Sequence, residues 1–507
     1  MTNGKQRKIG AILSYVSIVA STLVGLLYTP FMISKLGQNE YGLYSLVSSV
    51  IAYLTVLDLG FGNAIIVYTT KYRENKQFEN EKKLHGMFKI VYCLIGIVSG
   101  IIGIILFLNV GNMFGSTMNS IELSEMRIMM LILTFNLAIT FVFSIYSSII
   151  NAYERFVFQK ILSILNTILK PIIMIPLLFL GYKSIAMCIA ITIINMLVLL
   201  SNYYYCKYKL NIKVKYSGFD SNMFKLIMGY SLWIFLGTIV DKINWSVDQF
   251  VLGAVSGTIA VSVYAVAAHL NTMFVNLSTA MSSVLLPKVS KMVANNATNE
   301  EISNEFIKVG RIQYYIIFLM ISGFALFGKE FILAWVGREY LDSYYITLIL
   351  IVPLFVPLIQ NLGVSILQAK NMHKFRSILL TGIAIANIII SIPLAKMYQG
   401  IGSAIGTSIS LIIGNILIIN IYYYKKVKLD IPNFWKNIFY LTIPFVIPIT
   451  LIFLIMQCIV LTGFTSVIVY GSIYTILYLI VCYYFDFNKY EKGFIDKILK
   501  KIHLKRS

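Results

Sequence analysis

Fourteen apolar stretches, each long enough to cross a bilayer, recur along this chain and constrain its fold more than any other feature. A membrane-spanning helix needs about 20 mostly apolar residues, because the hydrocarbon core is roughly 30 Å thick. Inside lipid, only helices and closed barrels satisfy every backbone hydrogen bond, and stretches of this length are typical of helices. The candidate spans lie near residues 9–33, 41–70, 87–110, 127–150, 161–181, 184–205, 226–250, 259–285, 312–336, 343–368, 377–398, 401–423, 437–461 and 464–485.

The composition agrees with a chain that is solvated by lipid. Hydrophobic residues make up 58% of the 507 and charged residues only 12%, whereas soluble proteins have about 25% charged residues. The basic segment MTNGKQRKIG leads into the first apolar stretch without a small-residue cleavage site, so we expect it to begin a membrane helix. We therefore predict an all-α integral membrane protein with about 14 transmembrane helices.

Lysine and arginine residues alternate with the predicted spans. Of the 42, thirty-four lie in one set of segments, which includes both termini, and six lie in the other set. Cytoplasmic segments of membrane proteins carry such an excess, so both termini are predicted to be cytoplasmic. The net charge of +21 comes mainly from these basic segments. We expect them to face anionic lipid headgroups, so the positive charge does not require nucleic acid as a partner.

The sequence repeats itself at an offset near 219 residues. YYYCKYKL at 203–210 matches YYYKKVKL at 422–429. Four further residue pairs share nearly the same offset: Gly181 with Gly400, Ser184 with Ser403, Gly37 with Gly257, and Tyr44 with Tyr264. Tyrosines and lysines recur at the inner ends of many membrane helices, but matches at one offset favour a duplication.

Six helices separate the two copies, and an even number gives both copies the same topology. Parallel repeats of this kind are a transporter architecture in which the substrate path lies between the lobes. The predicted domains are an N-terminal lobe at 1–215 with spans one to six, and a C-terminal lobe at 216–430 with spans seven to twelve. Residues 431–507 add spans thirteen and fourteen and a basic cytoplasmic tail.

Five segments carry a family resemblance that covers about residues 5–485. They are LGQNEYGLYS at 36–45, YLTVLDLGFGNAI at 53–65, LWIFLGTIVDKINWSVDQFVLG at 232–253, VYAVAAHL at 263–270 and LLPKVSKM at 285–292. With the layout of spans, they resemble the multidrug/oligosaccharidyl-lipid/polysaccharide exporter superfamily. Within it, the chain is most similar to the polysaccharide biosynthesis or O-antigen repeat-unit flippase family.

The resemblance implies a two-lobed, alternating-access transporter of the bacterial plasma membrane. Its cargo would be undecaprenyl-pyrophosphate-linked oligosaccharide units, moved from the inner to the outer leaflet for surface polysaccharide such as capsule or O-antigen. We further expect coupling to a proton or sodium ion, because the sequence has no nucleotide-binding motif. Membrane lipids and a polysaccharide polymerase are the other partners that we expect. No cofactor is expected.

Ionisable residues inside predicted spans are functional candidates, because a charge in hydrocarbon is unfavourable. The five are Asp58, Lys170, Asp241, Lys242 and Asp248. We expect the three aspartates to be ligands for a coupling ion and the two lysines to bind a pyrophosphate. The alternatives are a carboxylate bonded to a neighbouring helix, an ion pair between Lys170 and Asp58, a lysine that extends to the interface, and an Asp248 that reaches external water.

The predicted seventh span is the most polar of all. Asp241, Asn244, Trp245 and Asp248 share one face by their helical spacing, and Lys242 lies roughly 100° away. We expect this face to line a central cavity, with Asn244 and Trp245 contacting sugar. Packing against other helices is the competing interpretation for Trp245.

Motifs for other chemistry are missing from the sequence. It has no GxxxxGK[ST], HExxH or GxSxG, and the isolated histidines His269 and His373 do not predict a metal site. A membrane-embedded polymerase or glycosyltransferase would need a large outer loop with catalytic side chains, whereas the longest predicted outer segment, 111–126, carries only Glu122 and Glu125 as charges. We therefore predict a transporter and no enzyme, with a cation-coupled multidrug exporter as the alternative.

Overall fold

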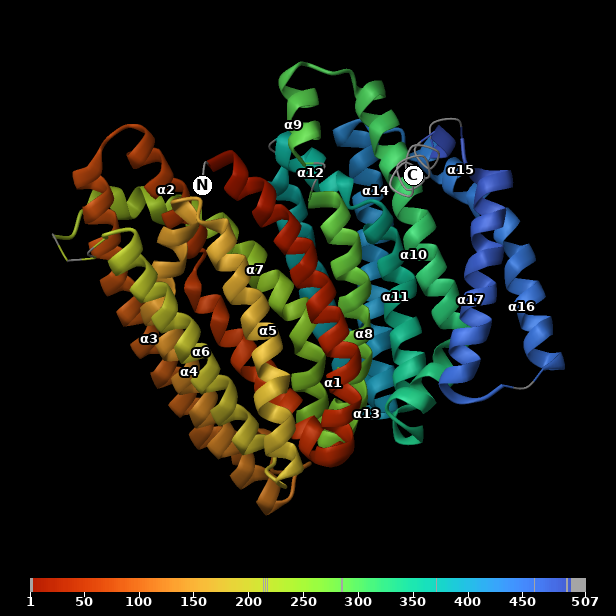
Figure 1. Cartoon of the computed structure of the whole chain (residues 1–507), viewed down its shortest axis with the longest axis horizontal. Helices are drawn as coiled ribbons and strands as arrows, with labels where there is room; N and C mark the ends of the chain where they lie inside the picture. The colour runs from red at the N-terminus through yellow and green to blue at the C-terminus, as the bar shows by residue number, and fades with distance from the viewer. Residues whose placement is uncertain are drawn as a thin grey trace, which may run out of the picture. The chain divides into compact units, whose positions relative to one another are not determined.

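The computed structural model describes residues 3–212, 214, 216, 218–283, 286–370, 372–459, 461–488 and 491–493, and every regular element within these ranges is a helix (Figure 1). The contacts divide the chain into two compact units. Unit 1 comprises Met1–Ala268 and Leu380–Thr407, and unit 2 comprises His269–Leu379 and Ser408–Ser507. These units describe packing, whereas the predicted boundaries at 215 and 430 describe a sequence repeat, so the predicted domains remain a prediction.

Unit 1 is formed mainly by the first seven helices. They are α1 (Asn3–Leu54), α2 (Phe61–Glu74), α3 (Phe78–Phe114), α4 (Ser120–Ala152), α5 (Phe156–Phe179), α6 (Ser184–Tyr204) and α7 (Ser221–Val255), with short turns η1 (Thr55–Asp58) and η2 (Tyr205–Lys209). Two long helices, α8 (Gly257–Ser283) and α13 (His373–Leu411), contribute residues to both units. Within unit 1, α3, α4 and α6 run side by side (Figure 1).

Unit 2 contains the remaining helices. They are α9 (Leu286–Ala294), α10 (Asn299–Trp335), α11 (Asp342–Ile359), α12 (Leu362–Ala369), α14 (Ile419–Tyr422), α15 (Ile431–Thr442), α16 (Val446–Cys458) and α17 (Gly463–Val481). The 3₁₀ segments η3 (Arg338–Tyr340) and η6 (Ile443–Phe445) precede α11 and α16. The π-helical segments η4 (Ile412–Ile418), η5 (Tyr423–Val427) and η7 (Cys482–Asp486) continue α13, α14 and α17.

Reciprocal side-chain bonds fix where two of the long helices begin. At the start of α4, the Asn119 side chain accepts from the backbone N–H of Glu122 at 2.9 Å, and the Glu122 carboxylate accepts from the backbone N–H of Asn119 at 3.0 Å. Thr298 and Glu301 make the same pair of bonds at the start of α10. Each capping box satisfies N–H groups that have no partner within the helix.

Eleven stretches of the described chain are helical, long enough and apolar enough to cross a membrane. Two of them are much longer than a bilayer requires, 63 residues at Ile12–Glu74 and 53 at Phe375–Val427. Each is interrupted by backbone that is not helical, at Gly37 and again at Leu59 and Gly60 in the first, and at Tyr398 and Gln399 in the second. The chain is therefore a helical protein with many apolar spans, and the count of fourteen remains a prediction.

Two glycines from the predicted repeat both have a positive φ. Gly37 interrupts α1 with φ 78°, and Gly257 separates α7 from α8 with φ 83°. Side chains disfavour this left-handed region, and glycine adopts it without strain. The two positions predicted to be equivalent therefore both allow a change of chain direction.

Aromatic packing joins the last helices to α10 in unit 2. Phe445 and Tyr478 stack with ring centroids 4.2 Å apart. The hydroxyls of Ser322 on α10 and Tyr474 on α17 lie 2.6 Å apart. The two helices that the sequence places outside the repeat are thus integral to the packing of this unit.

Candidate functional site

A network of hydroxyl groups surrounds the carboxylate of Asp248 inside unit 1. Asp248 lies on α7 and is 2% exposed. Its Oδ2 accepts from the Tyr264 hydroxyl at 2.5 Å and from the Thr407 hydroxyl at 2.9 Å, and its Oδ1 accepts from the Ser403 hydroxyl at 2.7 Å. No described cation lies among its partners, so three neutral hydroxyls stabilise a buried carboxylate.

The interrupted helix α13 supplies most of this network. Asn387 and Ser391 lie one turn apart before the break at Tyr398 and Gln399, and Ser403 and Thr407 lie one turn apart after it. The two segments pack closely, because a Cβ on Gly406 would lie 2.4 Å from the Ser391 Oγ and 2.7 Å from its Cα. Only glycine at 406 permits this approach, which brings both polar pairs together.

The network has more acceptor oxygens than hydroxyl protons to fill them. Thr407 carries one proton, yet its Oγ1 lies 2.9 Å from Asp248 Oδ2 and 3.0 Å from Asn387 Oδ1. Ser391 lies 2.6 Å from Asn387 Oδ1 and 3.2 Å from the carbonyl of Ser403. The amide nitrogen of Asn387 is buried without a described partner. Several oxygens therefore converge where a cation or an added proton would complete the bonding.

Asp58 lies at a break in a helix, which corrects the prediction of one continuous helix over 41–70. α1 ends at Leu54, the turn η1 follows, and Leu59 and Gly60 have φ of 53° and 75° before α2 begins. Asp58 is half-buried; its Oδ1 accepts from the Tyr92 hydroxyl at 2.8 Å and its Oδ2 from the Gly62 N–H at 3.5 Å. The carboxylate thus faces the start of α2, where backbone N–H groups favour negative charge.

Of the other predicted site residues, the structure describes the side chain of Lys170 alone. Lys170 lies in α5 directly before Pro171, is half-buried, and makes no hydrogen bond or ion pair with the described residues. It is therefore not paired with Asp58. The side chains of Asp241, Lys242, Asn244 and Trp245 lie outside the described part of α7.

Five residues of the Asp248 network escaped the sequence analysis as site residues. They are Tyr264, Asn387, Ser391, Ser403 and Thr407. Two signals could have found the four α13 residues: polar pairs spaced four apart inside apolar stretches, and Gly402 and Gly406 beside the second pair. Ser403 was noticed only as a member of the repeat, and Tyr264 as a member of the repeat and of the segment VYAVAAHL.

A second carboxylate cluster in unit 1 lies near the Gly37 break. Glu40 is 8% exposed and accepts from the Ser184 hydroxyl at 2.6 Å and from the Lys183 ammonium at 3.2 Å. The hydrogen bond to Glu40 and the charge of that carboxylate raise the pKa of Lys183, which lies between two spans. Glu122 on α4 accepts from the Thr258 hydroxyl on α8 at 2.9 Å. These bonds join α1 to the start of α6, and α4 to α8, at the ends predicted to be external.

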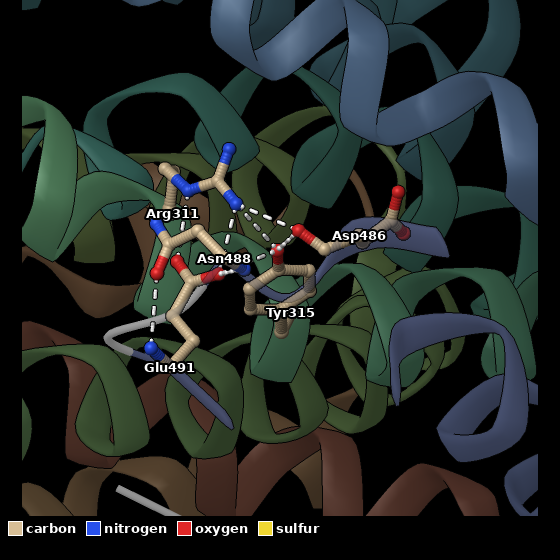
Figure 2. Close-up of polar contacts among 5 residues, drawn as sticks. All are labelled: Arg311, Tyr315, Asp486, Asn488 and Glu491. Atoms are coloured by element: carbon tan, nitrogen blue, oxygen red, sulfur yellow. Dashed lines mark hydrogen bonds and ion pairs between the residues drawn. The ribbon is translucent and has the colours of Figure 1, made fainter. Parts of the chain in front are cut away.

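A buried ion pair joins α10 to the segment after α17 in unit 2. Figure 2 shows the Arg311 guanidinium donating to both carboxylate oxygens of Glu491, each at 2.8 Å, and to the carbonyl of Asp486 at 2.9 Å. The Tyr315 hydroxyl accepts from Arg311 at 3.0 Å. The backbone N–H of Asn488 donates to the Glu491 carboxylate and the backbone N–H of Glu491 donates to the Asn488 side-chain oxygen, each at 2.9 Å, as in a capping box. This cluster holds the segment after α17 against α10.

The helical fold, the many apolar spans and the buried polar network define a multi-pass membrane protein of the transporter class. A sequence model of the family described as "Polysaccharide biosynthesis protein" matches residues 36–345, more than half of the chain, and the chain belongs to that family. The chain is 21% identical over 411 residues to the "Putative O-antigen transporter" of Shigella flexneri, with 78% of this chain and 93% of the relative covered.

Solved structures share the fold. The lipid II flippase MurJ in an inward closed conformation matches with a TM-score of 0.74 at 19% identity, covering 93% of this chain and 97% of MurJ. An inward-facing multidrug resistance MATE family transporter of the MOP superfamily matches with a TM-score of 0.63 at 14% identity, covering 82% and 97%. At these identities the likeness describes the fold alone.

Proposed function

We propose that this protein is a flippase that moves undecaprenyl-pyrophosphate-linked oligosaccharide units from the inner to the outer leaflet for surface polysaccharide synthesis. The observation that carries the proposal is membership of the polysaccharide biosynthesis family in a chain with many apolar spans. The name of the Shigella relative points the same way. A charged sugar headgroup cannot cross hydrocarbon unaided, because it would lose its hydration without replacement.

The topology that we propose has fourteen crossings and both termini in the cytoplasm, with two parallel six-helix lobes and two added helices. The breaks at Gly37 and at Tyr398 and Gln399 support counting each of the two longest apolar stretches as two crossings. α7 supplies one more, since it is 35 residues long and part of it lies outside the described side chains. The alternation of lysine and arginine supports the orientation.

Transport against a gradient would be coupled to a cation at the Asp248 network. One carboxylate carries one negative charge, so a proton or a sodium ion would leave the site neutral in its buried surroundings. The surrounding ligand atoms are oxygens from Asn387, Ser391, Ser403 and Thr407, and oxygen suits hard cations. Asp58 at its helix break and Asp241 are the further candidate ligands.

The pyrophosphate would be bound by Lys170 and Lys242, with Asn244 and Trp245 contacting the sugar. Support comes from Lys170, which is half-buried and has no counter-charge among the described residues. An unpaired ammonium in a low-dielectric setting attracts phosphate strongly. A polysaccharide polymerase would use the product on the outer leaflet.

Deletion of the gene tests the proposal directly. The expected result is lipid-linked repeat units stranded on the inner leaflet and loss of surface polysaccharide, both restored by the wild-type gene. Sensitivity to cationic dyes should not change. Persistent polysaccharide together with new dye sensitivity would instead identify a multidrug exporter, the second function that this fold accommodates.

A further inference from the structure

The turn that joins α7 to α8 packs against a distant part of unit 1. α7 ends at Val255, and α8 begins at Gly257, which has a φ of 83°. The corner between α3 and α4, residues 115–119, lies on this turn, since a Cβ on Gly257 would be 3.1 Å from the carbonyl oxygen of Thr117. Both segments are at ends predicted to be external.

Two side-chain hydrogen bonds fasten this region to the turn. The Thr117 hydroxyl donates at 2.7 Å to the carbonyl of Gly253, in the last turn of α7, where carbonyls lack partners within the helix. Glu122 divides its two carboxylate oxygens. Oε2 accepts from the backbone N–H of Asn119 at 3.0 Å, and Oε1 accepts from the Thr258 hydroxyl on α8 at 2.9 Å. The residue that caps α4 therefore also ties α4 to α8.

α1 contacts the same turn from a second direction. A Cβ on Gly42 would lie 2.0 Å from the carbonyl oxygen of Thr258 and 3.2 Å from the Cβ of Ser262. Small residues permit helices to approach this closely. The backbones of α1 and α8 therefore touch here, and Ser262 has no exposed surface.

These contacts cross the predicted boundary at residue 215 between the two lobes. α1, α3 and α4 come before this boundary, and α7 and α8 come after it, although all the contacting residues belong to unit 1. In a transporter built from parallel repeats, the substrate path lies between the lobes. Contacts of this kind at the outer ends would close that path. Each fastening is a side-chain bond, so it breaks without unfolding a helix.

We propose that Thr117 and Glu122 form a clasp over the α7–α8 turn that must open at the outer ends in every transport cycle. With the clasp closed, as in this structure, cargo between the lobes has no exit to the outer leaflet. When both bonds break, the turn separates from α1 and from the α3–α4 corner. The inference rests on the proposed flippase function and names the contacts that control release of the cargo.

A reversible cross-link across the clasp tests the inference. Glu122→Cys and Thr258→Cys are introduced together into a chain whose five native cysteines are replaced, because the two side chains are in contact. The pair is cross-linked in whole cells of the deletion strain by a short bifunctional methanethiosulfonate, and newly made surface polysaccharide is measured. We expect export to be lost in proportion to the cross-linked fraction and to return after reduction.

The matched control is the pair Glu40→Cys and Ser184→Cys. Glu40 also accepts from a hydroxyl, at 2.6 Å, and this contact joins α1 to α6 within one predicted lobe. Its cross-link should leave export as it is in the reduced pair. Export that continues through the cross-linked Glu122 and Thr258 pair, or equal loss in both pairs, would overturn the clasp while the proposed function stands. Failure of the wild-type chain to restore polysaccharide would instead overturn the proposed function.

Thr258→Val gives a second measurement that does not depend on the cysteine pair. Valine keeps the branched shape and removes the donor to Glu122. An impermeant maleimide should label Ser262→Cys in whole cells roughly 2- to 10-fold faster in this variant, because one net hydrogen bond no longer favours the closed clasp. Thr192→Val is the control, since the Thr192 hydroxyl donates within its own helix to the carbonyl of Cys188 at 2.8 Å. An unchanged labelling rate in Thr258→Val would contradict the clasp.

Discussion

The Ser403 hydroxyl donates a 2.7 Å hydrogen bond to Oδ1 of Asp248, which lies 155 residues earlier in the chain. Asp248 is on α7 and Ser403 follows the break in α13. Both are buried, so the bond replaces hydration that the carboxylate has lost. This contact joins an ionisable group of α7 to a helix segment that is far away in the sequence.

Asp248→Asn tests the role of this charge. The amide is close in size and neutral, so the protein should accumulate and melt at an unchanged or higher temperature. Dependence of polysaccharide export on sodium or pH should weaken about 10- to 100-fold, the range seen when groups that support a bound metal are changed. Export is measured by complementation of the deletion strain. Wild-type export with unaltered cation dependence would show that Asp248 is structural.

Gly406→Ala tests whether close packing assembles the network. The added methyl would meet Ser391 at 2.4 Å and its backbone at 2.7 Å, so α13 must shift. Overpacking of this kind destabilises by about 1–3 kcal/mol, and export should fall. Gly382→Ala in the same helix has no atom within 4 Å of the new methyl and should keep both stability and export. Equal behaviour of the two variants, measured by thermal unfolding and export, would contradict the packing argument.

The helical membrane fold followed from the sequence because apolar length alone requires it. The same reasoning predicted Asp58 and Asp248 as candidate site residues, since a charge inside an apolar stretch is conspicuous. The break beside Asp58 was missed although Gly60 has a φ of 75° there, because glycines are common inside membrane helices and Leu59 gives no signal of its own. Asn387 and Thr407 were missed because neutral polar residues are common in membrane helices, and only the fold brings them to Asp248.

Lys170→Ala tests the proposed pyrophosphate contact. Loss of one charge-assisted bond corresponds to about 1.5–3 kcal/mol, so substrate affinity should fall roughly 10- to 150-fold. The variant should insert and accumulate, because Lys170 has no described partner whose burial it supports. Lys501→Ala in the basic tail is the control and should do little. Normal export by Lys170→Ala would remove this lysine from the substrate path.

The proposed orientation is tested by single cysteines in a cysteine-free chain. Ser116 lies exposed between α3 and α4, and Ser256 lies between α7 and α8, both at ends predicted to be external. Cysteines at these positions should react with an impermeant thiol reagent in whole cells, and a cysteine at Ser217 should react only after lysis. Labelling at 217 in intact cells, or none at both outer positions, would reverse the orientation.

The Arg311–Glu491 pair gives a stability prediction for unit 2. The Arg311 and Glu491 side chains are 12% and 5% exposed, and the bidentate bonds in Figure 2 compensate both charges. Glu491→Ala leaves the guanidinium buried without its counter-charge, which is expected to destabilise by about 3–5 kcal/mol. The melting temperature in detergent should therefore fall.

The control for this pair is Glu79, whose ion pair with Lys82 is 79% and 68% exposed. Glu79→Ala should leave the melting temperature unchanged, because water and salt screen an exposed pair. Replacing both Arg311 and Glu491 with methionine should recover part of the loss, since no charge is then left buried. If Glu491→Ala melts like Glu79→Ala, the pair does not hold the segment after α17 against α10.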